Sequence, residues 1–161
     1  LTTKAEGITF THRLIHAVAA ALVKHSALRA VINGSRVKIE PTSVAVAMDT
    51  PHGLVAPVVR SAETLSLNQI AETIRDFRAR AERNALRGEE LRNGPFAITN
   101  LGMFGVDLFS AFVFHDQTAV LAVGRAANGK AWFNLAVDHR VVDGAEAARF
   151  LETLQAEILK S

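Results

Sequence analysis

The chain has 161 residues, of which 49% are hydrophobic and 21% charged, enough for one globular domain and too few for two independent cores. Its 18 basic and 16 acidic side chains leave a formal net charge of +2, so composition gives no reason to expect a nucleic-acid partner. The absence of cysteine excludes disulfides, thiolate nucleophiles and cysteine-ligated metals, and favours a reducing compartment. The longest apolar run, Ala17 to Val23, is far shorter than the roughly twenty residues that span a bilayer. These features predict a soluble domain with neither a nucleic-acid nor a membrane partner.

The spacing of apolar residues predicts two amphipathic helices in the first part of the chain, His12–His25 and Leu67–Leu86. Thr11 is the expected N-cap of the first helix, and Ser66 or Thr64 that of the second. Short β-branched runs lie between the two helices and indicate strands. These elements are the turn Asn33-Gly34 and the strands Val37–Ile39, Val44–Met48 and Leu54–Val59.

The second part of the chain reads as strands followed by a last helix. The predicted strands are Phe96–Thr99, Phe112–Phe114, Ala119–Gly124 and Ala131–Asp138. Asn128-Gly129 indicates a tight hairpin between the last two strands. The final helix follows Gly144, and its expected buried positions are Ala148, Leu151, Leu154 and Ile158. Three helices and six or seven strands place the chain in the mixed α/β class.

The segment Asp138–Gly144 puts a histidine at the end of an apolar strand, where a side chain is well placed to face a cleft. Because the unperturbed pKa of histidine lies near neutrality, His139 can take a proton from a thiol or hydroxyl and return it within one turnover. Asp143 can hold the turn together, and Gly144 permits a close backbone approach or an unusual dihedral angle. On these residues alone, a structural histidine satisfied by hydrogen bonds is the commoner explanation.

Upstream, the segment Phe96–Gly105 carries a hydroxyl from a strand into a glycine-bearing loop. The hydroxyl of Thr99 could donate a hydrogen bond to an oxyanion and so stabilise negative charge that develops in a reaction. Taken alone, a hydroxyl that satisfies loop backbone groups is again the commoner explanation.

Together, Ile98–Gly105 and Asp138–Gly144 closely resemble two signature segments of the dihydrolipoamide acyltransferase catalytic domain, the E2 component of 2-oxoacid dehydrogenase complexes. Ala45–Val59 is similar to that family's strand, turn and strand, and Ser66–Gly94 to its long helix and following loop. The resemblance covers nearly the whole chain. It implies that residues 1–161 form one acyltransferase catalytic domain.

The resemblance implies a chloramphenicol acetyltransferase-like fold, an α/β (α+β) sandwich in which a mixed sheet carries its helices on one face. It also implies acyl transfer between a dihydrolipoyl thiol and the thiol of coenzyme A. His139 would be the general base, Thr99 would hydrogen-bond the tetrahedral oxyanion, and Asp143 would order the turn. In this family, the histidine and the hydroxyl come from adjacent subunits of a trimer.

The same resemblance assigns substrate contacts to Asn100, Gly102, Arg140 and Gly144 and requires no metal. Coenzyme A would be a substrate, and the lipoyl group would be supplied by a domain outside this chain. The implied partners are two further copies in a homotrimer, a lipoyl domain and the other subunits of the complex. The expected location is the cytoplasm or, in a eukaryote, the mitochondrial matrix.

Four features depart from the family pattern. Family elements, including a basic helix, should precede Leu1, so the domain is expected to be N-terminally incomplete. Phe114–Gln117 replaces an Asn-Pro-Pro-Gln segment, and the link from Gly124 to His139 is shorter than usual. Leu159–Ser161 ends the chain without the apolar tail that docks trimers into larger cores, which predicts a trimer or a smaller assembly.

Other polar side chains favour structural roles. His12 and His16 have a spacing that can hold zinc, but no carboxylate stands at a suitable offset, so a helix face is the better interpretation. His52 is expected to be exposed in its turn. The second helix bears basic residues interleaved with acidic ones, which favours a solvated face with intrahelical pairs over a phosphate site. These basic residues are Arg75, Arg78, Arg80, Arg83 and Arg87.

An aromatic run follows the glycine loop and is expected to belong to the core or a subunit interface, as is Trp132. The run consists of Phe104, Phe109, Phe112 and Phe114. Two alternatives to the acyltransferase stay open. One is a non-catalytic trimeric scaffold of the same fold, and the other is a stand-alone chloramphenicol-type acetyltransferase whose acceptor is a hydroxyl.

Overall fold

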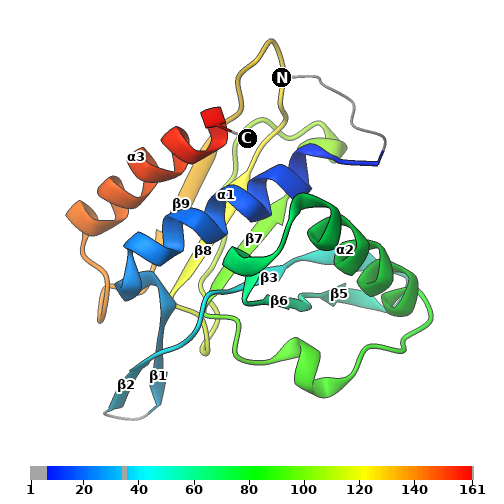
Figure 1. Cartoon of the computed structure of the whole chain (residues 1–161), viewed down its shortest axis with the longest axis horizontal. Helices are drawn as coiled ribbons and strands as arrows, with labels where there is room; N and C mark the ends of the chain where they lie inside the picture. Colours follow the sequence, from blue (N-terminus) through cyan, green and yellow to red (C-terminus); the bar gives the residue numbers. More distant parts are fainter. Residues whose placement is uncertain (1–6, 34–35, 161) are drawn as a thin grey trace.

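A computed structural model describes residues 7–33 and 36–160 of the chain (Figure 1). In these ranges the helices are α1 (Phe10–Lys24), α2 (Leu67–Ala81) and α3 (Gly144–Lys160). The strands are β1 (Ala30–Asn33), β2 (Arg36–Ile39), β3 (Ser43–Val46), β4 (Met48–Thr50), β5 (Gly53–Val55), β6 (Val58–Arg60), β7 (Phe96–Asn100), β8 (Ala119–Val123) and β9 (Phe133–Val137). Short 3-10 helices are η1 (Ser26–Arg29), η2 (Ala62–Thr64), η3 (Gly88–Leu91) and η4 (Gly102–Phe104).

Five strands form the central sheet in the order β6-β3-β7-β8-β9. Strands β3, β7 and β8 run parallel in the middle, and β6 and β9 are antiparallel edge strands. Every residue of β3 and β8 is buried, as parallel strands covered on both faces require. The antiparallel ribbons β1-β2 and β4-β5 are separate from this sheet.

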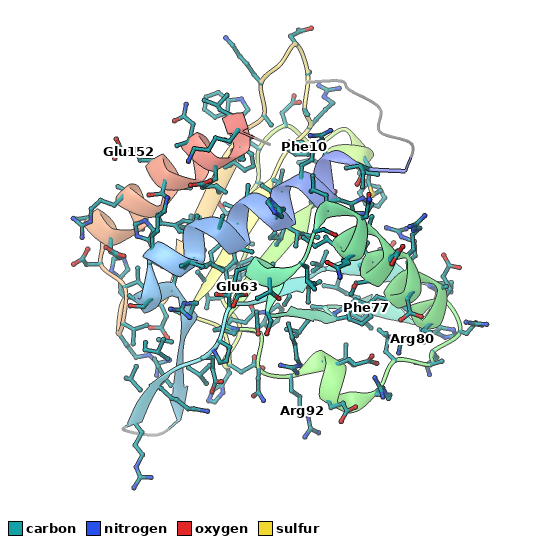
Figure 2. All side chains as sticks on the ribbon, in the orientation of Figure 1. Phe10, Glu63, Phe77, Arg80, Arg92 and Glu152 are labelled. Carbon is teal, nitrogen blue, oxygen red and sulfur yellow. The ribbon has the colours of Figure 1, made fainter. Side chains whose placement is uncertain are left out.

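All three helices cover one face of the central sheet (Figure 1). The main core between these layers joins Leu14 of α1 and Phe150 of α3 to Phe96 of β7, and all three side chains are fully buried. Phe77 of α2 is also buried, whereas Glu152 lies on the outer face of α3 (Figure 2). The predicted mixed α/β fold with helices on one face is confirmed.

The other face of the sheet is covered by an irregular segment between β7 and β8. Ala45, Ala97 and Val120 form a second buried cluster there, and Ala111 and Val113 pack against it. Side chains along β7 therefore alternate between the helix side and this second side.

Two predicted strands are each divided in the structure, because Val44–Met48 and Leu54–Val59 contribute to two sheets. The chain leaves the central sheet at Ala47 and returns after Pro57, and the intervening residues pair as the β4-β5 ribbon. Proline has no backbone N–H to continue a ladder, and Pro57 stands where the returning strand is interrupted.

The expected strand Phe112–Phe114 is wrong, since this stretch crosses the second sheet face without a ladder partner. Strand β1, which pairs with the predicted Val37–Ile39 strand, was not predicted. Of the Asn33-Gly34 turn, residue 34 lies outside the described residues. The Asn128-Gly129 hairpin is confirmed, with left-handed φ values of 52° and 72° and an antiparallel bridge beside it.

The N-cap of helix α1 lies two residues earlier than predicted. Thr9, not Thr11, is its N-cap, because Thr9 Oγ1 accepts a hydrogen bond from His12 N (3.4 Å) while His12 Nδ1 accepts one from Thr9 N (3.1 Å). Burial, followed by the cation of Arg75, lowers the pKa of His12, so the neutral ring needed for this acceptor role is favoured. His12 is therefore part of a capping box.

The other two helices also differ from the sequence pattern at their ends. Helix α2 has the predicted Ser66 cap but ends at Ala81, because Asn84 adopts a left-handed φ of 53°. In α3, Leu154 is buried as expected, Phe150 is an unpredicted core residue, and Ala148 is exposed. Apolar periodicity alone therefore placed the end of α2 five residues too late, at Leu86 instead of Ala81.

Candidate active site

His139 lies in the exposed turn between β9 and α3. Among the described residues its ring makes no hydrogen bond. The neighbouring carboxylate of Asp138 binds Arg140 instead, with Oδ2 2.6 Å from Nη2 and Oδ1 accepting from the Arg140 backbone N at 2.9 Å. These hydrogen bonds are the main cause that lowers the pKa of Asp138. The ion pair clamps the backbone on both sides of His139 and leaves the imidazole open to a ligand.

Thr99 is the fourth residue of β7 and is half-buried. By strand alternation its side chain lies on the second sheet face, the side of Ala97, while Asn100 lies on the helix side with Ile98. Thr99 thus stands on the face that the irregular segment covers.

The structure does not bring Thr99 and His139 together within one chain. Thr99 pairs with Ala122 of β8, which pairs with Asn134 of β9, and His139 follows Asn134 by five residues. Five residues along a strand and two strand spacings separate the two Cα atoms by roughly 19 Å. The β9-α3 turn accordingly lies at the opposite end of the sheet from the loop that follows β7 (Figure 1).

Asn100 and Gly102 hold the loop that follows Thr99. Asn100 Nδ2 donates to Thr11 Oγ1 of α1 (3.2 Å), and Asn100 Oδ1 accepts from Gly102 N (2.9 Å). A Cβ on Gly102 would lie 2.9 Å from the carbonyl oxygen of Gly124, so only glycine lets the loop approach the end of β8 this closely. Both residues predicted to contact substrate therefore have contacts inside the chain that order the loop.

Asp143 caps α3 by accepting a hydrogen bond at Oδ1 from Glu146 N (2.7 Å). The carboxylate thus orders the turn that His139 occupies. The reason expected for Gly144 is wrong within this chain, because its φ is not positive and a Cβ added there would meet nothing within 4 Å. Gly144 and Arg140 are exposed beside His139.

An apolar surface follows the Thr99 loop. Phe112 is 88% exposed, and Phe104, Phe114 and Trp132 are also exposed, while Phe109 is half-buried. Burial in the core, one of the two roles predicted for these side chains, is excluded for the four exposed residues. The other predicted role, a subunit interface, stays a prediction for these four side chains.

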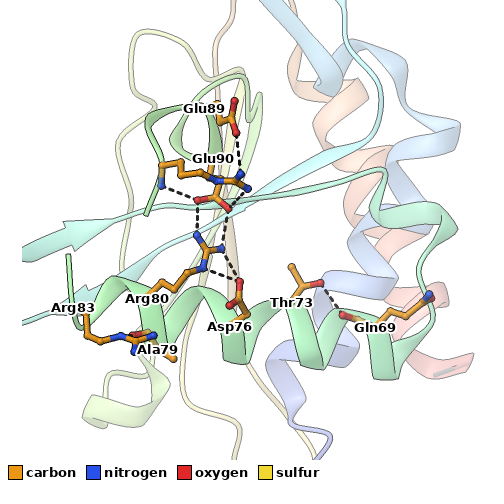
Figure 3. A network of polar contacts seen from close by, with 9 residues as sticks. Gln69, Thr73, Asp76, Ala79, Arg80, Arg83, Glu89 and Glu90 are labelled. Atoms are coloured by element: carbon orange, nitrogen blue, oxygen red, sulfur yellow. Dashed lines mark hydrogen bonds and ion pairs between the residues drawn. The ribbon is translucent and has the colours of Figure 1, made fainter. Parts of the chain in front are cut away.

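Away from these residues, a cavity of about 430 Å³ lies between β6, α2 and η3 and is lined partly by Glu90. Arg80 grips the Glu90 carboxylate with two hydrogen bonds of 2.7 and 2.8 Å, and its Nη2 lies 2.6 Å from Asp76 Oδ2 (Figure 3). The Arg80 hydrogen bonds are the main cause that holds the pKa of Glu90 far below its usual range. The predicted ion pairs within the helix are confirmed for Arg80 with Asp76. The spacing of residues in the sequence did not predict the ion pair between Arg80 and Glu90.

A second buried polar group was missed by sequence reasoning. His25 follows α1, and its two ring nitrogens lie 2.9 Å from Glu146 Oε1 and 2.8 Å from Thr153 Oγ1 of α3. More than a hundred residues separate these partners, so no local pattern could have found them.

No helix in the described ranges is long and apolar enough to cross a membrane. The same ranges contain no group of three or more histidine or acidic side chains arranged to hold a metal ion.

Comparison with known proteins gives a consistent family. A family model for the 2-oxoacid dehydrogenases acyltransferase (catalytic domain) matches residues 1–161. The dihydrolipoyllysine-residue acetyltransferase component of the acetoin cleaving system of Bacillus subtilis is 32% identical in an alignment of 161 positions that covers 92% of this chain and 40% of that protein. The acetyltransferase component of the mitochondrial pyruvate dehydrogenase complex of Schizosaccharomyces pombe is 39% identical over 127 residues, 70% of this chain and 26% of that protein. The chain therefore spans less than half the length of these relatives.

Solved structures agree with the sequence comparison. The dihydrolipoamide acetyltransferase (E2p) of Azotobacter vinelandii superposes with a TM-score of 0.85 at 29% identity, covering 94% of this chain and 68% of that one. A chloramphenicol acetyltransferase matches with a TM-score of 0.61 at 15% identity over 93% of this chain and 78% of that one, which confirms the expected fold alone. Because the family model matches every residue, the chain belongs to the 2-oxoacid dehydrogenase acyltransferase (catalytic domain) family.

Proposed function

We propose that residues 1–161 form one catalytic domain that transfers an acyl group between a dihydrolipoyl thiol and the thiol of coenzyme A, within a 2-oxoacid dehydrogenase complex. The family match over the whole chain is the observation that carries this proposal. Thr99 and His139 supply the two groups that thioester exchange requires, a donor for developing negative charge and a base for a thiol.

In the proposed reaction, the imidazole of His139 takes the proton from the thiol of coenzyme A. The resulting thiolate attacks the thioester carbonyl of the acyl-dihydrolipoyl group, and the hydroxyl of Thr99 donates a hydrogen bond to the oxyanion that forms. The tetrahedral intermediate collapses by breaking the bond to the dihydrolipoyl sulfur, which receives the proton from the imidazolium. Acyl-coenzyme A and a free dihydrolipoyl thiol leave, and His139 is restored. Asp143 serves the reaction by capping α3 and ordering the turn.

We further propose that the site forms between subunits of a homotrimer. The separation of roughly 19 Å within one chain is too long for Thr99 and His139 to contact the same substrate atom, which supports a site in which a second copy supplies one of them. The exposed apolar side chains around Phe112 supply a surface for that contact. Arg140 and Gly144 stay predicted substrate contacts because both are exposed beside His139.

The acyl donor in this proposal is a lipoyl group on a domain outside these 161 residues, and the other subunits of the complex are the remaining partners. Related proteins are named as mitochondrial and chloroplastic, and others are bacterial. We propose the cytoplasm or the mitochondrial matrix as the location.

A thioester assay tests the proposal, with acyl-dihydrolipoamide as donor and coenzyme A as acceptor. Removal of a general base lowers kcat by about 10²- to 10⁴-fold, and we expect this of His139→Ala. Removal of an oxyanion donor costs about 10²- to 10³-fold, and we expect this of Thr99→Ala. A His139→Ala protein as fast as the parent would show that the assignment is wrong.

The two alternatives are separated by further outcomes of the same assay. A trimer that neither binds coenzyme A nor transfers an acyl group would be a scaffold. Transfer to hydroxyl acceptors but not to thiols would identify a chloramphenicol-type enzyme.

A further inference from the structure

A buried histidine outside the proposed site connects α1 to the turn that carries His139. We propose that His25 is a positioning residue for His139, acting through Glu146 and Asp143. This inference rests on the proposed function, because the importance of His139 comes from that proposal.

The contacts of His25 lie along one face of α3. Its Nδ1 is 2.9 Å from Glu146 Oε1, its Nε2 is 2.8 Å from Thr153 Oγ1, and its ring stands edge-on to Phe150 at 5.7 Å between centroids. Glu146, Phe150 and Thr153 are spaced by four and three residues, so they share one side of the helix. His25 itself is only 9% exposed. This histidine therefore contacts the first three turns of α3 from the end of α1.

Both nitrogens of the His25 ring have hydrogen-bond partners on α3. The carboxylate of Glu146 only accepts, so it takes the proton of Nδ1, and a hydrogen bond to a carboxylate is charge-assisted. Thr153 Oγ1 lies within hydrogen-bond distance of both His25 Nε2 and Arg149 O (3.0 Å), so the hydroxyl joins the ring to the helix backbone. In agreement, the hydrogen bond to His25 is the largest cause that lowers the pKa of Glu146, followed by that to Arg149.

Glu146 passes this restraint to the His139 turn. Its backbone N donates to Asp143 Oδ1 at 2.7 Å, while its side chain is held by His25 and by Arg149 (3.0 Å). At the other end of the turn, Asp138 binds Arg140. His139 therefore lies between the Asp138–Arg140 ion pair and the Asp143–Glu146 hydrogen bond, and only the latter depends on where the first turn of α3 lies.

Such a restraint matters for a general base. A base must lie within hydrogen-bond reach of the proton that it removes, and an error of about 1 Å in placing a reacting group can cost on the order of 10²-fold in rate. Because the His139 ring has no hydrogen bond of its own among the described residues, its backbone sets its position. Loss of the His25–Glu146 contact should thus lower kcat and leave substrate binding nearly unchanged.

The test uses the full-length assembled protein with His25→Gln, Glu146→Gln and the double variant. Lys24→Gln is the matched control, because Lys24 also joins α1 to α3 by an ion pair (2.9 Å) but reaches Glu157, three turns beyond Glu146. We expect each single variant to lower kcat by roughly tenfold with KM for both substrates within about twofold of the parent. The double variant should lose no more than the worse single variant, because both residues act through one link. The control should keep the parent kcat.

Hydrogen exchange gives a readout that does not depend on activity. Amides of residues 138–147 should exchange faster in His25→Gln and Glu146→Gln than in the parent and in Lys24→Gln. A folded, assembled His25→Gln protein with parental kcat would overturn the inference, as would an equal loss in Lys24→Gln or additive losses in the double variant. If the parent itself transfers no acyl group, the proposed function fails, and the exchange rates still decide whether His25 orders the turn.

Discussion

Mixed assemblies provide a sharp test of a site shared between protomers. Thr99 and His139 lie at opposite ends of the sheet, and in the proposed function each complete site takes an intact threonine from one protomer and an intact histidine from its neighbour. In a cyclic assembly made from equal amounts of Thr99→Ala and His139→Ala chains, each requirement is met about half of the time. About a quarter of the sites should then be complete in the random mixture, and about one third in purified trimers that contain both variants. Each variant alone should show roughly 1% of parental activity or less.

The assay is acyl transfer to coenzyme A by hetero-oligomers purified through a different affinity tag on each variant. Co-assembly with a differently tagged copy of the same variant is the control, since mixing identical defects restores no site. Activity in the mixture that stays at the mean of the two single variants, with mixed assembly verified by native mass spectrometry, would refute a shared site. That result would mean that no site combines the threonine of one protomer with the histidine of its neighbour.

Three further predictions concern stability and the loop beside the site. The pKa of Glu90 is lowered in the folded state, so the ionised carboxylate stabilises the fold above pH 4.5, its ordinary pKa, and this stabilisation is lost as the pH falls through the folded-state pKa. Glu90→Gln should therefore lower the free energy of unfolding by about 2 kcal/mol at pH 7 in denaturant unfolding, and the difference from the parent should shrink in acid. Phe150 is fully buried against Phe96, and Phe150→Ala should lower the free energy of unfolding by about 3 to 5 kcal/mol. A variant with the parental free energy of unfolding would rule out a core role for Phe150. The carbonyl oxygen of Asp107 occupies the place that a Cβ on Gly124 would take, so Gly124→Ala should displace the loop that contains Asp107. We expect a Tm lower by several degrees and weaker assembly in sedimentation, and a parental sedimentation profile would contradict this account.

The family of this domain could be inferred from short stretches of sequence. His139 and Thr99 stand in two segments whose residue order resembles one family, and the family model matches the whole chain. Helical periodicity likewise predicted most of α1, all of α2 with five further residues at its end, and α3, because each helix buries one stripe of apolar residues at a spacing that the backbone dictates. Asn128-Gly129 predicted its hairpin because both residues readily adopt positive φ.

Contacts between distant residues were decided only by the tertiary structure. The ladder partner of the Val37–Ile39 strand and the split of two predicted strands depend on which strands meet. The exposure of Phe112 reflects the path of the chain over the sheet, which composition cannot reveal.

The same limit applies to the site. Sequence order shows that Thr99 and His139 are present, but only the strand register shows that one chain holds them roughly 19 Å apart. The His25–Glu146 contact joins residues that are 121 positions apart, and Arg80 reaches Glu90 beyond the end of its own helix. Residue type and local spacing determine which groups are available, whereas packing of the helices on the sheet determines which groups meet, because that packing is a property of the whole chain.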